Sequence, residues 1–135
     1  MANAQTQMLM SYREAKGMHA RQEDGDIVRA GWKLDNTELA LYFDLSKEGY
    51  VSIIGHDFIK VADDKFDKII WAINDANAKY SFVKFVLNKE ENEILLMIDA
   101  VVQLDSCAEE TFELMVRSAQ IVDDAYPELM KAMWA

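Results

Sequence analysis

The stretch LALYFDLSKEGYVSII, residues 39–54, decides how this chain of 135 residues folds. Apolar side chains occupy every second position from Leu39 to Leu45, which is typical of a strand that buries one face. Residues 47–49 reverse the chain, because their glycine readily takes the positive φ of a tight hairpin. The alternation resumes at Val51. We therefore expect two antiparallel strands joined by a short loop.

Further strand-like alternation lies on both sides of this hairpin. Before it, residues 27–34 alternate, and residues 19–22 are a candidate short pairing strand. After it, residues 82–87 and 94–104 alternate on either side of the loop 89–92, which predicts a second hairpin. Connections this short join antiparallel neighbours.

Three segments show the helical period of about 3.6 residues. They are residues 4–16, residues 63–76 and residues 108–134. The last segment carries two apolar stripes, and the second stripe includes Leu114 and Ile121. A helix that rests only on a sheet needs one stripe, so two stripes suggest two packing partners.

Two local signals refine these helices. Gly17 is a natural stop for the first helix, because glycine takes the left-handed cap without steric penalty. Pro127 predicts a kink or a break in the last helix. The whole pattern predicts a single α+β domain spanning residues 1–135, an antiparallel sheet with helices packed on it. The element order is α-β-β-β-α-β-β-α, or has a fourth strand in the first group if residues 19–22 pair.

Composition excludes several classes of protein. The chain is 51% hydrophobic with five Gly and one Pro, too apolar for a disordered tail. Its 14 basic and 24 acidic residues give a net charge of −10, which repels phosphate, so we expect no nucleic-acid or anionic membrane partner. The first residues lack signal-peptide features and no apolar run approaches the ~20 residues of a membrane span. A cytoplasmic protein is expected.

Residues able to do chemistry are few. Cys107 is the only cysteine, which excludes an internal disulfide and a multi-cysteine zinc site in one chain. It precedes the last predicted helix, whose dipole would lower the pKa of the thiol, but Glu109 and Glu110 oppose that effect. His56 and Asp57 are paired like a base and its orienter, yet adjacent strand residues point to opposite faces.

Established site motifs are absent from the sequence. It contains no phosphate-cradling glycine motif, nucleophile elbow, zinc-binding histidine pair or EF-hand spacing. We therefore expect no enzyme, no cofactor and no metal site. The alternative is a small-ligand-binding domain, or an enzyme assembled from scattered residues such as His56, Asp57 and Cys107.

The outer faces of the expected strands are more apolar than a water-facing sheet should be. They carry Ala40, Tyr42, Tyr50, Ile54, Phe82, Val86, Leu95, Met97 and Val101. A cover is therefore expected on part of this second side. The N-terminal helix, a second subunit or a client segment could each provide it.

Trp71 stands apart on the second helix. It lies roughly 150° from the apolar stripe of that helix, among polar neighbours; the stripe is Phe66, Ile69, Ile70 and Ile73. Either another segment of the chain covers Trp71, or it anchors an interface, since Trp and Tyr concentrate binding energy. We expect a homodimer whose interface includes Trp71 or the spare sheet face. The candidate partner or dimer residues are Tyr42, Tyr50, Trp71, Phe82, Leu114 and Ile121.

Several phrases resemble the YbjN family, bacterial proteins labelled sensory transduction regulators. The phrases are YREAKG (12–17), GWKL (31–34), LYFDL (41–45), ANAKYSFVKF (76–85) and IVDDAYPELM (121–130). The family is similar in fold to type III secretion chaperones, which are small acidic homodimers. The resemblance implies their fold and offers no catalytic residues; client binding does not transfer with a fold. We expect a non-catalytic interaction module, either a regulator or a chaperone-like partner-binding protein.

Overall fold

The strands pair into one six-stranded antiparallel sheet in a computed structural model that describes residues 2–17, 19–35 and 37–134. The strands are β1 (Ala20–Gln22), β2 (Ile27–Lys33), β3 (Glu38–Asp44), β4 (Tyr50–Lys60), β5 (Lys84–Asn88) and β6 (Glu93–Val101). Their order across the sheet is β1-β2-β3-β4-β6-β5. The opening stretch forms the β3–β4 hairpin, in which Phe43 pairs with Ile53. The sequence prediction of an α+β fold is confirmed, with β1 as the additional short strand.

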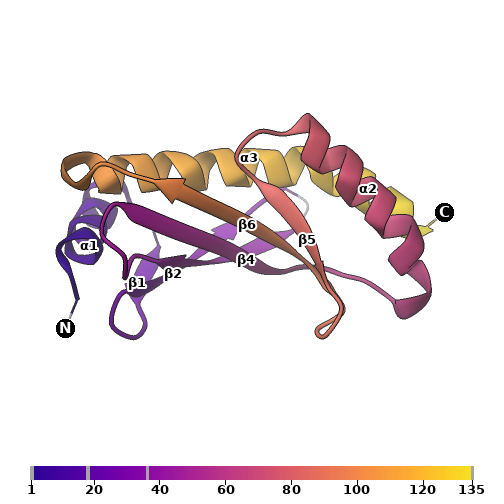
Figure 1. Ribbon diagram of the computed structural model, residues 1–135, viewed down its shortest axis with the longest axis horizontal. Helices are drawn as coiled ribbons and strands as arrows, with labels where there is room; N and C mark the ends of the chain where they lie inside the picture. Colours follow the sequence, from indigo (N-terminus) through magenta and orange to yellow (C-terminus); the bar gives the residue numbers. More distant parts are fainter. Residues whose placement is uncertain (1, 18, 36, 135) are drawn as a thin grey trace.

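Three helices cover one face of this sheet (Figure 1). They are α1 (Ala4–Lys16), α2 (Phe66–Lys79) and α3 (Cys107–Trp134), with short 3-10 helices at Asp63–Lys65 and Leu104–Ser106. The longest helix, α3, lies along the sheet, with α1 and α2 packed against it at opposite ends (Figure 1). Its wide apolar arc is therefore used twice, against the sheet and against the other helices of the same chain.

The core lies between the sheet and the helices, as the alternation requires. Leu41 and Phe43 of β3, Ile53 of β4 and Leu96 of β6 are buried there. Leu9 of α1, Ile69 of α2 and Met115 of α3 reach the same cluster; each is fully or almost fully buried. Burying apolar area at roughly 25 cal/mol per Å² is what holds the two layers together.

Three details of the helices bear on the sequence predictions. Gly17 caps α1 with φ of +66°, as expected for a left-handed stop. Pro127 lies inside α3, which continues through it as one helix, so the break, one of the two outcomes predicted there, is wrong. Pro127 is exposed, so water can donate a hydrogen bond to the backbone carbonyl that the missing N–H of proline leaves without its helical partner. Ile70, expected in the buried stripe of α2, is 46% exposed.

Side chains from the helices form hydrogen bonds with backbone groups at both edges of the sheet. At the β5 edge, the Asn77 carboxamide accepts from Phe85 N–H at 2.7 Å and donates to Phe85 C=O at 3.0 Å. Lys84 Nζ donates in return to the α2 carbonyls of Asn77 and Tyr80. At the β1 edge, Arg13 of α1 donates to Ala20 C=O. Backbone groups that already form these hydrogen bonds are not available for pairing with another strand.

Candidate partner-binding surfaces

The face of the sheet that is turned away from the helices is not covered by any of the described segments; we call it the open face. Its side chains are those that pair across the strands on the outward side of the pleat. They include Arg29, Ala40, Tyr42, Tyr50, Ser52, Ile54, His56, Glu93, Leu95, Met97, Asp99, Val101 and Val86. The N-terminal helix, one of the expected covers, lies on the opposite side (Figure 1).

An apolar row crosses the middle of the open face. Tyr42 pairs with Ile54, and Ile54 pairs with Met97 on the next strand. Leu95 and Val86 form a second apolar pair beside this row. All five side chains keep contact with solvent. A sheet face that stays wet normally carries polar residues at such positions, so this composition indicates a surface that becomes covered.

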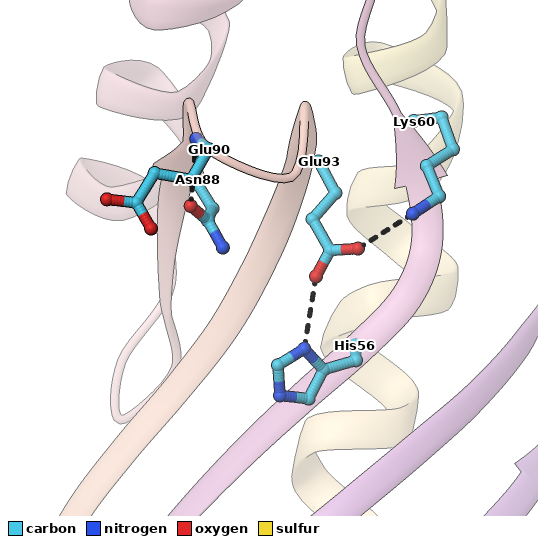
Figure 2. Close-up of polar contacts among 5 residues, drawn as sticks. All are labelled: His56, Lys60, Asn88, Glu90 and Glu93. Atoms are coloured by element: carbon cyan, nitrogen blue, oxygen red, sulfur yellow. Dashed lines mark hydrogen bonds and ion pairs between the residues drawn. The ribbon is translucent and has the colours of Figure 1, made fainter.

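A chain of polar and aromatic contacts holds the edge of this row. The Arg29 guanidinium lies 5.8 Å from the ring centroid of Tyr42. The Tyr42 and His56 rings meet edge to face at 5.6 Å. His56 Nδ1 lies 3.0 Å from one carboxylate oxygen of Glu93, and Lys60 Nζ lies 3.0 Å from the other (Figure 2). Tyr42 is thus fixed from two sides.

Among the carboxylates whose side chains are described on this face, Glu93 is the buried one, at 3% exposure. Burial alone would raise the pKa of Glu93, but the hydrogen bonds and charges of Lys60 and His56 outweigh burial and hold that pKa below its ordinary value. Nearby, the Asn88 side chain accepts from the backbone N–H of Glu90 and shapes the turn before Glu93 (Figure 2). The carboxylate therefore remains ionised and orients His56.

A bulge in β4 makes this cluster. Between Gly55 and Ile59 the register against β6 shifts, because four steps along β4 face two steps from Leu96 to Ile94. Gly55 sits where a Cβ would be 2.7 Å from a Leu96 methyl carbon, so only glycine fits there. The sequence pattern is irregular at this point, but it does not show that one carboxylate meets both His56 and Lys60. Sequence reasoning missed Glu93 for that reason.

A second surface is a groove between α2 and the C-terminal half of α3, with a volume of about 630 Å³. Its lining, which defines the α2–α3 groove, is Lys68, Trp71, Ala72, Asp75, Ala76, Lys79, Tyr80, Ala125, Glu128, Leu129, Lys131 and Ala132. The small alanine side chains on both helices leave the space that forms the groove. Trp71 lines this groove and is 70% exposed. No described segment folds over Trp71, so the first of its two expected outcomes, cover by another segment of the same chain, is not observed.

Tyr80 lines the groove and is held in place by two contacts. Its hydroxyl donates to the Asp124 carboxylate of α3, and Lys79 Nζ lies 5.1 Å from the centroid of its ring. Burial and the bond to Asp124 raise the pKa of Tyr80, and the contact with Tyr80 raises the pKa of Lys79. Both groups therefore keep their protons at neutral pH, which leaves a fixed phenol and an ammonium beside the hollow.

The remaining candidate residues separate in the structure. Tyr50 lies on the open face beside Asp99, whose hydrogen bond raises the pKa of the phenol. Phe82 is not on that face: β5 begins only at Lys84, and Phe82 has φ of +71°. Its ring is 58% exposed and lies 5.9 Å from the Arg117 guanidinium on α3. Leu114 and Ile121, by contrast, are half-buried against the core.

Two residues of the enzyme alternative, His56 and Cys107, lie in different layers of the molecule. Cys107 is buried in the helix layer with its sulfur 3.9 Å from that of Met8, and burial raises the pKa of its thiol. His56 points to the open face, opposite to the inward direction of Gly55. The side chain of Asp57 is outside the described part. Among the described residues no three His, Cys, Asp or Glu side chains are grouped to hold a metal ion.

None of the helices in the described segments combines the length and the apolar character that crossing a bilayer requires.

Comparisons with known proteins give a likeness in structure. No protein-family model matches the chain, and no curated protein matches it. Among solved structures, it is similar to the crystal structure of YbjN from E. coli, described as "a putative transcription regulator". The TM-score is 0.65 over 90% of both chains, and the sequence identity is 12%. The structural likeness expected from the sequence phrases is thus confirmed: this chain has the YbjN fold.

Proposed function

We propose that this chain is a non-catalytic protein-interaction module of the bacterial cytoplasm, a regulator or chaperone-like partner-binding protein that acts as a homodimer. The observation that carries the proposal is Trp71, a large aromatic side chain 70% exposed in the wall of an alanine-floored groove. Trp is the residue that most often concentrates binding energy when a partner excludes water around it. The groove is thus proposed to take an apolar segment of a partner protein.

The YbjN likeness supports a regulatory role, since that protein is described as a regulator. The charge of −10 disfavours direct contact with DNA phosphates, so regulation would pass through protein contacts. The likeness of the YbjN family to secretion chaperones would fit the same partner-binding role.

The test uses the two most exposed tryptophans as a matched pair. Trp134, at the end of α3, is 81% exposed and does not line the groove. A photoreactive phenylalanine placed at position 71 or 134 in the native cell should give a discrete protein adduct only at position 71. For the partner so identified, Trp71→Ala should weaken binding by about 30-fold, or ~2 kcal/mol, whereas Trp134→Ala should not. Equal adducts at both positions, or an unchanged affinity in Trp71→Ala, would refute the proposal.

A small-ligand site is the second candidate, and the groove volume favours it. A hollow of about 630 Å³ falls within the ~300–1,000 Å³ of ligand pockets. Screening by tryptophan fluorescence distinguishes the two functions, because a ligand in the groove should quench Trp71 and the quenching should persist in Trp134→Phe.

A further inference from the structure

The open face differs in charge from the rest of the molecule. Its strand positions carry four basic and four acidic side chains: Arg21, Arg29, Lys33 and Lys60, with Glu38, Asp44, Glu93 and Asp99. Lys84 is left out because its Nζ bends over the sheet edge to the carbonyls of α2. The face is therefore neutral, and the whole net charge of −10 belongs to the remaining surface. Two copies can meet through this face without the repulsion that acidic surfaces would impose.

The size of the face is adequate for a stable contact. Six strands at a spacing of about 4.8 Å, each near seven residues at about 3.3 Å, give roughly 24 Å by 23 Å, or about 550 Å² of projected area. Side chains make the accessible area larger than this projection. A stable dimer buries about 800 Å² from each partner, so the open face provides an area of the required order.

The sheet edges point to the same conclusion. Asn77 occupies both backbone groups of Phe85 on β5, and Arg13 occupies the carbonyl of Ala20 on β1. Strand addition at those positions would have to displace these side chains first. The open face remains accessible to a partner. On it, the ring of Tyr42 is already held in place by contacts with Arg29 and His56.

We propose that a second copy of this chain covers the open face, so that two sheets pack face to face around a two-fold axis through the apolar row Tyr42, Ile54 and Met97. This inference rests on the homodimer of the proposed function and assigns its surface. The helices lie on the other side of each sheet (Figure 1). The α2–α3 groove is lined by two of these helices, so both grooves would point outward in the dimer. The assembly then presents two partner sites.

The test is sedimentation equilibrium of the full chain over micromolar concentrations. Wild-type protein should form a dimer of 15.5 kDa subunits, and Met97→Glu should raise the dissociation constant at least 30-fold, because the dimer would then have to bury a charge inside the interface. Ile70→Glu is the matched control: Ile70 is a half-exposed apolar residue of α2, away from the open face. It should leave the dissociation constant unchanged.

A second variant covers the case that Met97→Glu does not fold, as judged by circular dichroism. Val101→Glu changes a residue that is 78% exposed at the end of β6, and it should weaken the dimer in the same direction. A dimer that neither open-face variant weakens would refute this surface while leaving the homodimer standing. A wild-type chain that stays at 15.5 kDa throughout would refute both.

Discussion

Glu93 is a buried carboxylate with two side-chain partners, His56 and Lys60. It is buried between the Lys60 ammonium and the His56 imidazole, on a face whose other side chains contact solvent. Its pKa in the folded protein lies below the ordinary value of about 4.5. A carboxyl with a depressed folded pKa stabilises the fold above the unfolded pKa and loses that contribution as the pH falls through the folded pKa. The stabilisation by Glu93 should therefore be complete near pH 7 and fade below pH 4.5.

The substitution Glu93→Gln tests this directly. At pH 7 it should lower the free energy of unfolding by about 1–3 kcal/mol, because His56 and Lys60 lose their charged acceptor. The difference from wild type should shrink between pH 4.5 and pH 3, measured by urea unfolding at each pH. Glu91→Gln, in the exposed turn beside it, is the control and should change little at any pH. A deficit for Glu93→Gln that stays constant with pH would contradict the ionised state of Glu93.

Single residues also show what the sequence can and cannot reveal. The exposure of Trp71 follows from its angle on a helix, since 100° per residue places it away from the stripe. The buried state of Glu93 does not follow from alternation, because a bulge two strands away in sequence brings its partners to it. Phe82 shows the same limit. Alternation in the sequence predicts a strand that already includes Phe82, whereas the positive φ of Phe82 interrupts the extended backbone and β5 begins only at Lys84.

At the scale of elements, the junction of α2 and β5 is held by a reciprocal exchange. Asn77 bonds both backbone groups of Phe85, and Lys84 bonds the last carbonyls of α2. These residues lie within the phrase 76–85 that carries the YbjN resemblance. The exchange gives that phrase a physical role, because it fixes the helix to the sheet edge and at the same time closes the edge.

Removing the carboxamide should therefore have two effects. Asn77→Ala leaves the N–H and C=O of Phe85 without their partner and should destabilise the fold by about 1–3 kcal/mol in urea unfolding. It should also raise concentration-dependent aggregation, measured by light scattering, because the edge strand becomes open to pairing. Asn74→Ala, an exposed position one turn earlier in α2, should do neither. Equal stability of Asn77→Ala and Asn74→Ala would contradict a sealing role for Asn77.

Elements were the scale at which the sequence was most informative. Period-two runs located the two long hairpins, and Gly17 marked the end of α1. The continuation of α3 through Pro127 was not readable, because it depends on the exposed side of the helix at that point and on the packing that holds the last turns. Local propensity gives way to tertiary context in such places.

At the scale of the whole molecule, charge and apolar surface are divided between the two sides of the sheet. The surplus of apolar residues on the outer strand positions was visible in the sequence, and none of the described helices lies over it (Figure 1). Which side each helix takes depends on how three amphipathic segments share one core, and alternation does not encode that choice. The neutrality of the open face likewise emerges only when the pairing register is known.

The central claim is that a second copy covers the open face and leaves the α2–α3 groove free. Oxidative footprinting read by mass spectrometry tests it on the wild-type protein, because methionine and tryptophan side chains report their own exposure. Above the dissociation constant of the dimer, Met97 should be oxidised several-fold more slowly than in dilute solution, while Trp71 should be oxidised at the same rate. Oxidation of Met97 that does not change with concentration, or protection of Trp71 in its place, would contradict the account.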